Sequence, residues 1–272
     1  MSDSLSTTWP PGSQIQAVRF VATATASEPG LVELAAPIAQ RAIAVAEGQQ
    51  ADALLLTIPV AADPALESDP QLLAWIAPDG RDSPQRQLIV LQGAQLHWHL
   101  PRIALLASPQ RLELVRPAVL EMLFLENELR SIESELARLW PDLEADAALA
   151  FSFEERSLTQ RDSLRHRFLR VVCLRSRLAK ITPRLVIPQV YPPTLASQMQ
   201  ERLRERLHVS NRLEALETQL ELFERIYDQG GQRASDYLLS RRSYILEWFI
   251  VILLLLQIVL QAIELLSAGN PN

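Results

Sequence analysis

Apolar and polar residues alternate with two different periods along the chain. Up to Pro109 the pattern is mixed: some segments, such as residues 16–25, alternate at a period of two, which favours β-strands, and one segment has helical spacing. After Pro109, apolar residues recur three and four positions apart, as they do on amphipathic helices. From Tyr244 to Leu266 the sequence is almost continuously apolar. We therefore predict an α+β protein with an N-terminal mixed α/β sheet domain, a C-terminal helical coiled-coil domain and one C-terminal transmembrane helix.

The N-terminal pattern predicts a compact sheet. An amphipathic helix is expected over residues 31–48, where Leu31, Leu34 and Ile38 have helical spacing, so the chain should begin with the order strand, helix, strand. Gly93 suits a hairpin turn between two later strands. The predicted strands cover residues 16–25, 51–60, 87–91, 95–100 and 102–107.

Three amphipathic helices are expected in the second domain. The first should end at Trp140-Pro141, the second at Thr182-Pro183, and the third, which begins near Leu195, at Gly230-Gly231. The first two have apolar stripes made of Val115, Ala118, Met122, Leu125, Leu129, Ile132, Leu136 and Leu139, and of Leu164, Phe168, Val171, Leu174, Leu178 and Ile181. In the third helix, we predict an oligomerisation seam of Leu213, Leu216, Leu220, Phe223 and Tyr227.

The apolar C-terminal stretch is long enough to cross a bilayer, for which about twenty residues are needed. A buried core helix is the alternative, but Phe249 to Leu256 has no polar face. Gln257 and Gln261 lie four residues apart on one side, where they could hydrogen-bond to a second copy of the chain. At the other end, the predicted membrane-interface residues are Arg241, Arg242, Tyr244, Glu247 and Trp248.

The charges predict where the protein resides. Because Arg241 and Arg242 should stay in the cytosol, we expect a tail-anchored, single-pass membrane protein with most of the chain cytoplasmic. The first 14 residues do not resemble a signal peptide or a mitochondrial presequence, which favours a bacterial inner membrane over a mitochondrial membrane. The net charge of −6 argues against general nucleic-acid binding, and no specific DNA binding is expected. One cysteine, Cys173, precludes an intramolecular disulfide and fits a reducing compartment.

The predicted organisation follows from these patterns. It comprises a flexible N-terminus at residues 1–14, an α+β head domain at 15–109, a helical coiled-coil domain at 110–232, a juxtamembrane segment at 233–243, a transmembrane anchor at 244–266 and a tail at 267–272.

The helix that leads into the anchor resembles a known family. Its sequence is similar to the C-terminal signature of the "required for meiotic nuclear division" family, also called YagE or domain of unknown function 155, of bacterial type. The resemblance implies a membrane-anchored, self-associating protein without known catalytic activity, whose mitochondrial relatives are linked to translation of membrane proteins. The matching residues are Arg212, Leu213, Leu216, Leu220, Arg242, Leu246, Glu247 and Trp248.

A basic run in the second helix gives two readings. It could bind RNA phosphates or anionic lipid headgroups. It could instead pair with the acidic preceding helix, which contains Glu121, Glu126, Glu128, Glu133 and Glu135, and we slightly favour this pairing. The candidate basic face consists of Arg165, Arg167, Arg170, Arg177, Lys180 and Arg184.

The sequence shows few candidates for catalytic chemistry. His97 and His99 would share one strand face, but two ligands do not make a zinc site, and no catalytic or phosphate-binding motif is recognised. We therefore predict no catalytic residue, metal or cofactor, and expect a scaffold or adaptor that binds membranes and copies of itself. The family resemblance implies ribosomal or other translation components as further partners. The alternative is a membrane-tethered enzyme or ligand-sensing domain with its site in the N-terminal head.

Overall fold

The computed structural model describes residues 9–23, 30–46, 49–60, 70–77, 86–151, 161–186 and 192–268. The chain divides into two compact units, to both of which three long helices contribute. Unit 1 consists of Met1–Ser134 and Ser176–Leu216, and unit 2 of Glu135–Arg175 and Glu217–Asn272. The combination of a mixed sheet with long helices confirms the predicted α+β class.

Unit 1 contains a seven-stranded sheet with the order β2-β3-β1-β4-β7-β6-β5. The neighbours β4 and β7 are parallel, whereas the other neighbouring pairs are antiparallel. The strands are β1 (Gln14–Ala22), β2 (Val32–Leu34), β3 (Gln40–Val45), β4 (Ala53–Pro59), β5 (Gln87–Leu91), β6 (Ala94–His99) and β7 (Arg102–Ala107).

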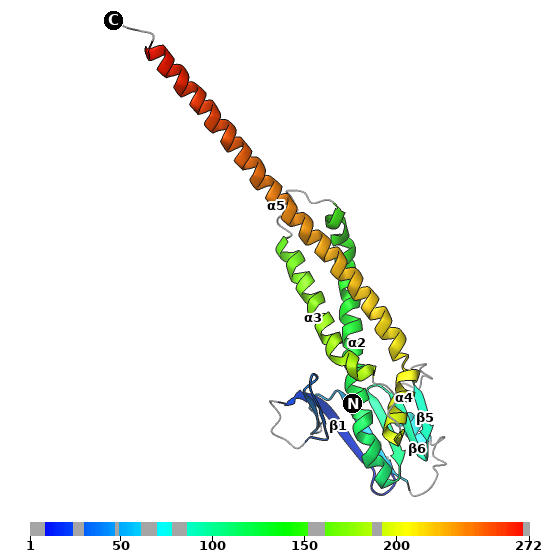
Figure 1. Cartoon of the computed structure of the whole chain (residues 1–272). Helices are drawn as coiled ribbons and strands as arrows, with labels where there is room; N and C mark the ends of the chain where they lie inside the picture. The colour runs from blue at the N-terminus through cyan, green and yellow to red at the C-terminus, as the bar shows by residue number, and fades with distance from the viewer. Residues whose placement is uncertain are drawn as a thin grey trace, which may run out of the picture. The chain divides into compact units, whose positions relative to one another are not determined.

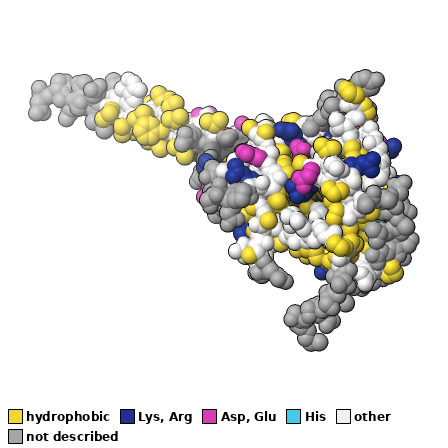
Figure 2. Space-filling view, turned by 90° about the horizontal axis from the view of Figure 1, so that it is seen from below, with side chains coloured by type: hydrophobic (Ala, Val, Ile, Leu, Met, Phe, Trp, Pro, Cys, Tyr) yellow, Lys and Arg dark blue, Asp and Glu magenta, His cyan; other side chains and the backbone are white. Residues whose placement is uncertain are grey.

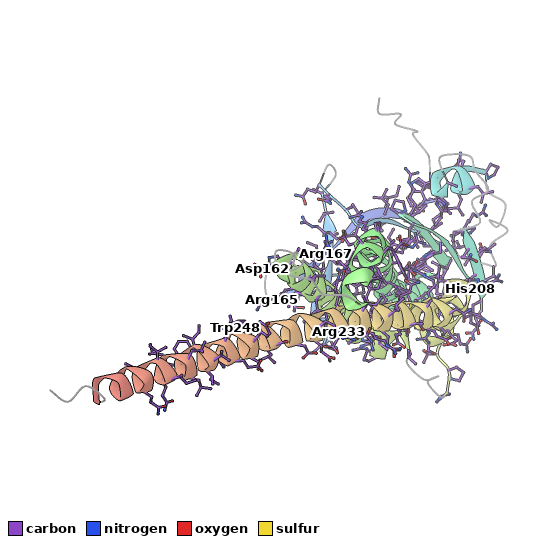
Figure 3. The ribbon with its side chains drawn as sticks, turned by 90° about the horizontal axis from the view of Figure 1, so that it is seen from above. Asp162, Arg165, Arg167, His208, Arg233 and Trp248 are labelled. Carbon is purple, nitrogen blue, oxygen red and sulfur yellow. The ribbon has the colours of Figure 1, made fainter. Side chains whose placement is uncertain are left out.

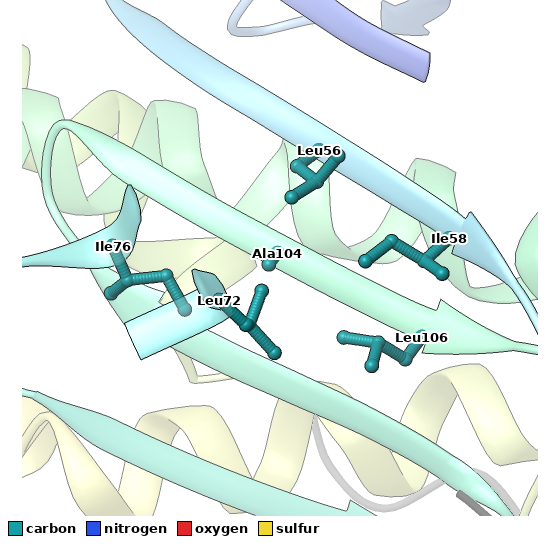
Figure 4. Close-up of a cluster of buried hydrophobic side chains, with 6 residues drawn as sticks. All are labelled: Leu56, Ile58, Leu72, Ile76, Ala104 and Leu106. Carbon is teal, nitrogen blue, oxygen red and sulfur yellow. The ribbon is translucent and has the colours of Figure 1, made fainter. Parts of the chain in front are cut away.

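Both faces of the sheet are covered. On one face, the short helix α1 (Pro70–Ile76) packs its two buried residues on β4 and β7, in the cluster of Leu56, Ile58, Leu72, Ile76, Ala104 and Leu106 shown in Figure 4. The opposite face meets the long helix that follows β7, since Phe20 on β1 contacts Phe124 with ring centroids 5.2 Å apart. Alternation along β4 supplies both faces with apolar side chains, which is why this strand is apolar at almost every position.

The predicted helix over residues 31–48 is wrong. This segment forms β2 and β3, which pair with each other and with β1. Pro37 interrupts the helical pattern, and Ala39 has a φ of 51°, which is incompatible with a right-handed helix. The spacing of apolar residues was therefore helical by coincidence.

The other strand predictions in the head are confirmed. β4 lies within residues 51–60, β5 and β6 form the expected hairpin, and β7 has the predicted bounds. Gly93 lies in the hairpin turn with a φ of 73°, a conformation that glycine adopts without steric cost. The ends of two predicted elements, at residues 24–25 and 47–48, lie outside the described residues.

The chain after β7 is helical, as predicted. It forms α2 (Pro109–Phe151), α3 (Arg161–Leu185), α4 (Leu195–Arg206) and α5 (Val209–Ala268). In Figure 1, α2, α3 and α5 are the three long helices, and the last part of α5 continues alone. The eight predicted stripe residues of α2 are all buried, and so are the four stripe residues of α3 that follow Phe168.

Two predicted helix ends are wrong. α2 continues past Pro141, because Trp140 packs on Phe223 with ring centroids 5.1 Å apart and Leu143 is buried after the proline. α5 continues past Gly230 and Gly231. A glycine destabilises a helix by about 1 kcal/mol but retains its backbone N–H, so the helix need not end there. The second helix does end near its predicted stop, two residues beyond Pro183.

Candidate membrane anchor and interaction surfaces

The last part of α5 is long and apolar enough to cross a membrane. The stretch Ser243–Gln261 contains 19 residues, and none of its side chains is buried inside the chain. At 1.5 Å per residue it measures about 28 Å, close to the thickness of a bilayer core. Figure 2 shows hydrophobic side chains in yellow along the visible side of this stretch, and Figure 3 labels Trp248 near its beginning.

The predicted interface and anchor residues lie on this same stretch. Tyr244, Glu247 and Trp248 are exposed within its first two turns, and Gln257 and Gln261 are exposed near its end. The side chains of Arg241 and Arg242 lie outside the described residues. An exposed apolar helix surface of this extent requires a cover, and a lipid bilayer or other protein surfaces can provide one.

The predicted oligomerisation seam of α5 lies in the interior of the single chain. Leu220 and Phe223 have no exposed surface, and Leu213, Leu216 and Tyr227 are at most 7% exposed. These side chains are therefore used in the packing of α5 within one chain. Contact between copies needs other residues.

A buried carboxylate links α2 to α5 within unit 1. The side chain of Glu126 has no exposed surface and accepts hydrogen bonds from Arg130 at 2.5 Å and from Arg212 at 2.8 Å. Arg212 also donates to Glu133, at 2.7 Å. Burial on its own lowers the pKa of Arg212, but the hydrogen bond to Glu133 and the charge of Glu126 more than reverse this and raise the pKa. Arg212 thus stays charged and neutralises the buried carboxylate.

A second polar cluster joins the three helices of unit 2. Arg167 on α3 donates to both carboxylate oxygens of Asp146 on α2, at 2.6 Å, and lies 3.4 Å from Asp142. The hydroxyl of Tyr227 on α5 donates to Asp146 at 3.3 Å. The hydrogen bond from Arg167 to Asp146 raises the pKa of the arginine, while burial and then the charge of Asp146 raise the pKa of Tyr227. The cluster is therefore an ion pair with a neutral phenol.

The structure separates the predicted basic face into two groups. Arg177 contacts Glu128 at 2.7 Å and Arg184 contacts Glu121 at 3.6 Å, so together with Arg167 they pair with α2. These three contacts agree with the reading in which the basic run pairs with the acidic helix. The remaining residues, Arg165, Arg170 and Lys180, are exposed and form no ion pair with the described residues.

The histidines of β6 lie on the sheet face that carries the α1 cluster. His97 pairs with Leu88 and Ala104, has no exposed surface, and has no hydrogen-bond partner for either ring nitrogen among the described residues. Burial and then the positive charge of Arg86 lower the pKa of His97 from 6.5 to about 4. The imidazole is therefore neutral at pH 7. Over the described ranges, no three His, Cys, Asp or Glu side chains are placed to hold a metal ion.

The sequence contains a signal for the two polar clusters. Asp146 follows Leu139 and Leu143 at the spacing of the apolar stripe, and Glu126 follows Met122 by four residues. A charged residue at a stripe position is buried when the helix packs, so it needs a partner of opposite charge. The identity of that partner depends on how the helices face each other.

Comparison with known proteins gives no relative. No family model, curated protein or solved structure matches the chain. The resemblance to the "required for meiotic nuclear division" family therefore stays a prediction from the residues of α5.

Proposed function

We propose that the protein is a non-enzymatic, self-associating scaffold that is anchored in a membrane by the end of α5 and faces the cytosol. The observation that carries this proposal is that one continuous helix, α5, has two parts with different surroundings. The first part of α5 is packed against α2 and α3, whereas Ser243–Gln261 is apolar and entirely exposed. The bilayer is a cover that fits its length and composition.

The orientation and the compartment are part of the proposal. Arg241 and Arg242 precede the apolar stretch, and basic residues at the end of a membrane helix favour the cytoplasmic side. A bacterial inner membrane is the membrane we expect. Extraction of membranes with alkaline carbonate tests the anchor: the full chain should stay in the pellet, whereas replacement of Leu253, Leu254 and Leu255 by Asp should release it. Release of the unaltered chain would contradict the anchor.

The partner that we propose is the translation machinery. The exposed cations Arg165, Arg170 and Lys180 on α3 are free of ion pairs with the described residues and could neutralise RNA phosphates. Gently solubilised full-length protein is sedimented through a gradient with and without ribonuclease. Co-migration with ribosomes that ribonuclease abolishes is the expected result. Migration as a ribosome-free oligomer in both samples would contradict the link to translation and leave the self-associating anchor in place.

A second candidate function rests on His97. A buried imidazole whose two nitrogens have no partner among the described residues could bind a polar ligand in the head domain. The protein would then be a membrane-tethered sensor or enzyme. A small molecule that raises the melting temperature of the unaltered protein, but not that of His97→Leu, would favour this second function over the scaffold.

A further inference from the structure

One face of the sheet in unit 1 gathers arginine and histidine side chains at three neighbouring strands. His97 and His99 are two positions apart on β6, so both project to the face that carries the α1 cluster shown in Figure 4. His99 pairs with Arg102 on β7. Arg86 immediately precedes β5 and, because Leu88 pairs with His97, it lies on the same face beside His99. These four side chains, Arg86, His97, His99 and Arg102, are called the Arg–His cluster below.

The elements around the Arg–His cluster contain no acidic residue. The sequences of α1, β5, β6 and β7 are PQLLAWI, QLIVL, AQLHWH and RIALLA, without an Asp or Glu. Neither arginine of the cluster forms an ion pair with another residue in the part of the chain that the structure describes. In a chain with a net charge of −6, the cluster is therefore a local site of positive potential.

His97 forms the buried end of the cluster. Its side chain has no exposed surface, and neither ring nitrogen has a hydrogen-bond partner among the described residues. The Nδ1 atom of His99 is also buried without a described partner. Burial and then the positive charge of Arg86 lower the pKa of His97, so the charge of this arginine acts on the imidazole. Because buried polar groups in folded proteins are nearly always hydrogen-bonded, these ring nitrogens indicate a polar partner.

The two arginines and His99 form the accessible rim of the cluster, since all three are half-buried. Arg102 donates a hydrogen bond to the backbone carbonyl of Trp75 at 2.5 Å, and its Cζ atom lies 5.5 Å from the centroid of the Trp75 ring. These contacts with α1 fix the position of the guanidinium. A guanidinium has five N–H donors, so one bond to a carbonyl leaves others for a ligand. An anion that enters between the rim residues meets donors from three strands.

We propose that the Arg–His cluster binds the phosphate group of a ligand, with Arg86 and Arg102 at the rim and His97 at the buried end. A guanidinium presents paired N–H donors that match two phosphate oxygens, and each imidazole supplies a further N–H. A tetrahedral phosphate accepts hydrogen bonds from several directions, whereas one guanidinium satisfies a planar carboxylate, so donors from three strands favour phosphate. This inference rests on the second proposed function, a ligand-binding head domain, and names the class of its ligand.

Binding of inorganic phosphate to the full chain in mild detergent tests the site. Phosphate should raise the melting temperature more than chloride at the same ionic strength, and titration calorimetry gives the dissociation constant. Arg86→Gln and Arg102→Gln should each raise this constant by about tenfold or more, because charge-assisted hydrogen bonds are lost. The matched control is Arg19→Gln, which should leave it unchanged. Arg19 is an exposed cation on the same sheet face, four residues beyond Ile15, which pairs with Leu56 of the α1 cluster.

Urea unfolding separates lost binding from lost folding. Arg102 also holds α1, so Arg102→Gln should be less stable than the unaltered chain. Arg86→Gln removes no hydrogen bond or ion pair that the structure describes, so it should unfold at the same urea concentration as the unaltered chain. Weaker phosphate binding by a fully folded Arg86→Gln is therefore a direct effect on the site.

The pH dependence of sulfate binding is an independent test of His97. Sulfate stays a dianion between pH 7 and pH 5, and its charge favours the protonated imidazole, so its affinity should rise by about tenfold over this range. The charged and titratable groups that face His97 are Arg86 beside β5, Arg102 on β7 and His99 on β6, while α1 contains none. His97→Leu should show a smaller rise, and an equal rise would remove His97 from the site.

Glucose 6-phosphate and short-chain phosphatidate distinguish the two sources of a phosphate group. Both should displace inorganic phosphate, and the one that binds more tightly identifies a soluble metabolite or a lipid headgroup.

Several results would overturn the phosphate site. These are displacement by neither compound, a melting temperature no higher in phosphate than in chloride, unchanged binding by Arg86→Gln, or an equal loss with Arg19→Gln. A neutral ligand that stabilises the protein where phosphate does not would also overturn it, but would keep the second proposed function. Failure of the anchor is seen separately, since alkaline carbonate would then release the protein.

Discussion

Acid should destabilise the head domain through His97. The folded protein binds a proton on this imidazole only below a pKa of about 4, whereas the unfolded chain binds one below 6.5. Between these values the unfolded state holds more protons, so the free energy of unfolding falls as the pH falls from 6.5 to 4. Above pH 6.5 the imidazole is neutral in both states, so His97 adds no pH dependence to the free energy of unfolding there. From the two pKa values, the loss is about 2 kcal/mol between pH 7.5 and pH 5.0, and about 3 kcal/mol by pH 4.

The measurement compares the unaltered chain with His97→Leu. Both are unfolded with urea in mild detergent at pH 7.5 and 5.0, and unfolding is followed by tryptophan fluorescence, to which the buried Trp98 of the same strand contributes. Carboxylates add a pH dependence that both chains share, so the difference between the chains isolates the histidine. Between pH 7.5 and pH 5.0, the free energy of unfolding of His97→Leu should fall by about 2 kcal/mol less than that of the unaltered protein. Equal losses would refute the reasoning that His97 is buried as a neutral imidazole.

Three further perturbations follow from the structure. Glu126→Gln should destabilise the protein by about 3 kcal/mol in urea unfolding, because Arg130 and Arg212 lose their buried counter-charge. The control Glu128→Gln should show a smaller change, since the carboxylate of Glu128 is partly exposed. Gly231→Ala should raise stability by about 0.5–1 kcal/mol in the same assay, since open space surrounds the added methyl group and alanine favours the helix; a loss of stability would mean that the glycine has a needed conformation. Replacement of Gln257 and Gln261 by Leu should leave carbonate resistance intact and reduce the size of the detergent-solubilised particle, and an unchanged size would contradict a polar contact between anchors.

Local patterns predicted the elements whose stability is determined locally. The hairpin around Gly93 combines two alternating runs with a turn residue, and the stripes of α2 and α3 repeat over many turns, so both signals are strong. Residues 31–48 show the opposite case. Their apolar positions fit a helix and a strand about equally, and pairing of β3 with the distant strand β1 decides between them.

The continuation of α2 past Pro141 and of α5 past Gly230 was harder to predict for a related reason. Pro141 and Gly230 weaken a helix locally, but the packing of Trp140 on Phe223 supports α2 at the proline. Such support comes from residues far along the chain, which a pattern of residues does not reveal. The same applies to the basic run, where the pairing of α3 with α2 selects Arg167, Arg177 and Arg184 and leaves Arg165 exposed.

The two buried charge clusters also fix which residues of the helices lie level with each other. If α5 slipped by one heptad along α2, Gln219 would replace Arg212 beside Glu126, and the buried carboxylate would lose its counter-charge. Leucines alone do not forbid this slip, because a heptad repeat presents equivalent apolar residues seven positions apart. In unit 2, Asp146 holds Arg167 and Tyr227 in the same way. Buried charges therefore select the register of the helices that the repeated leucines leave open.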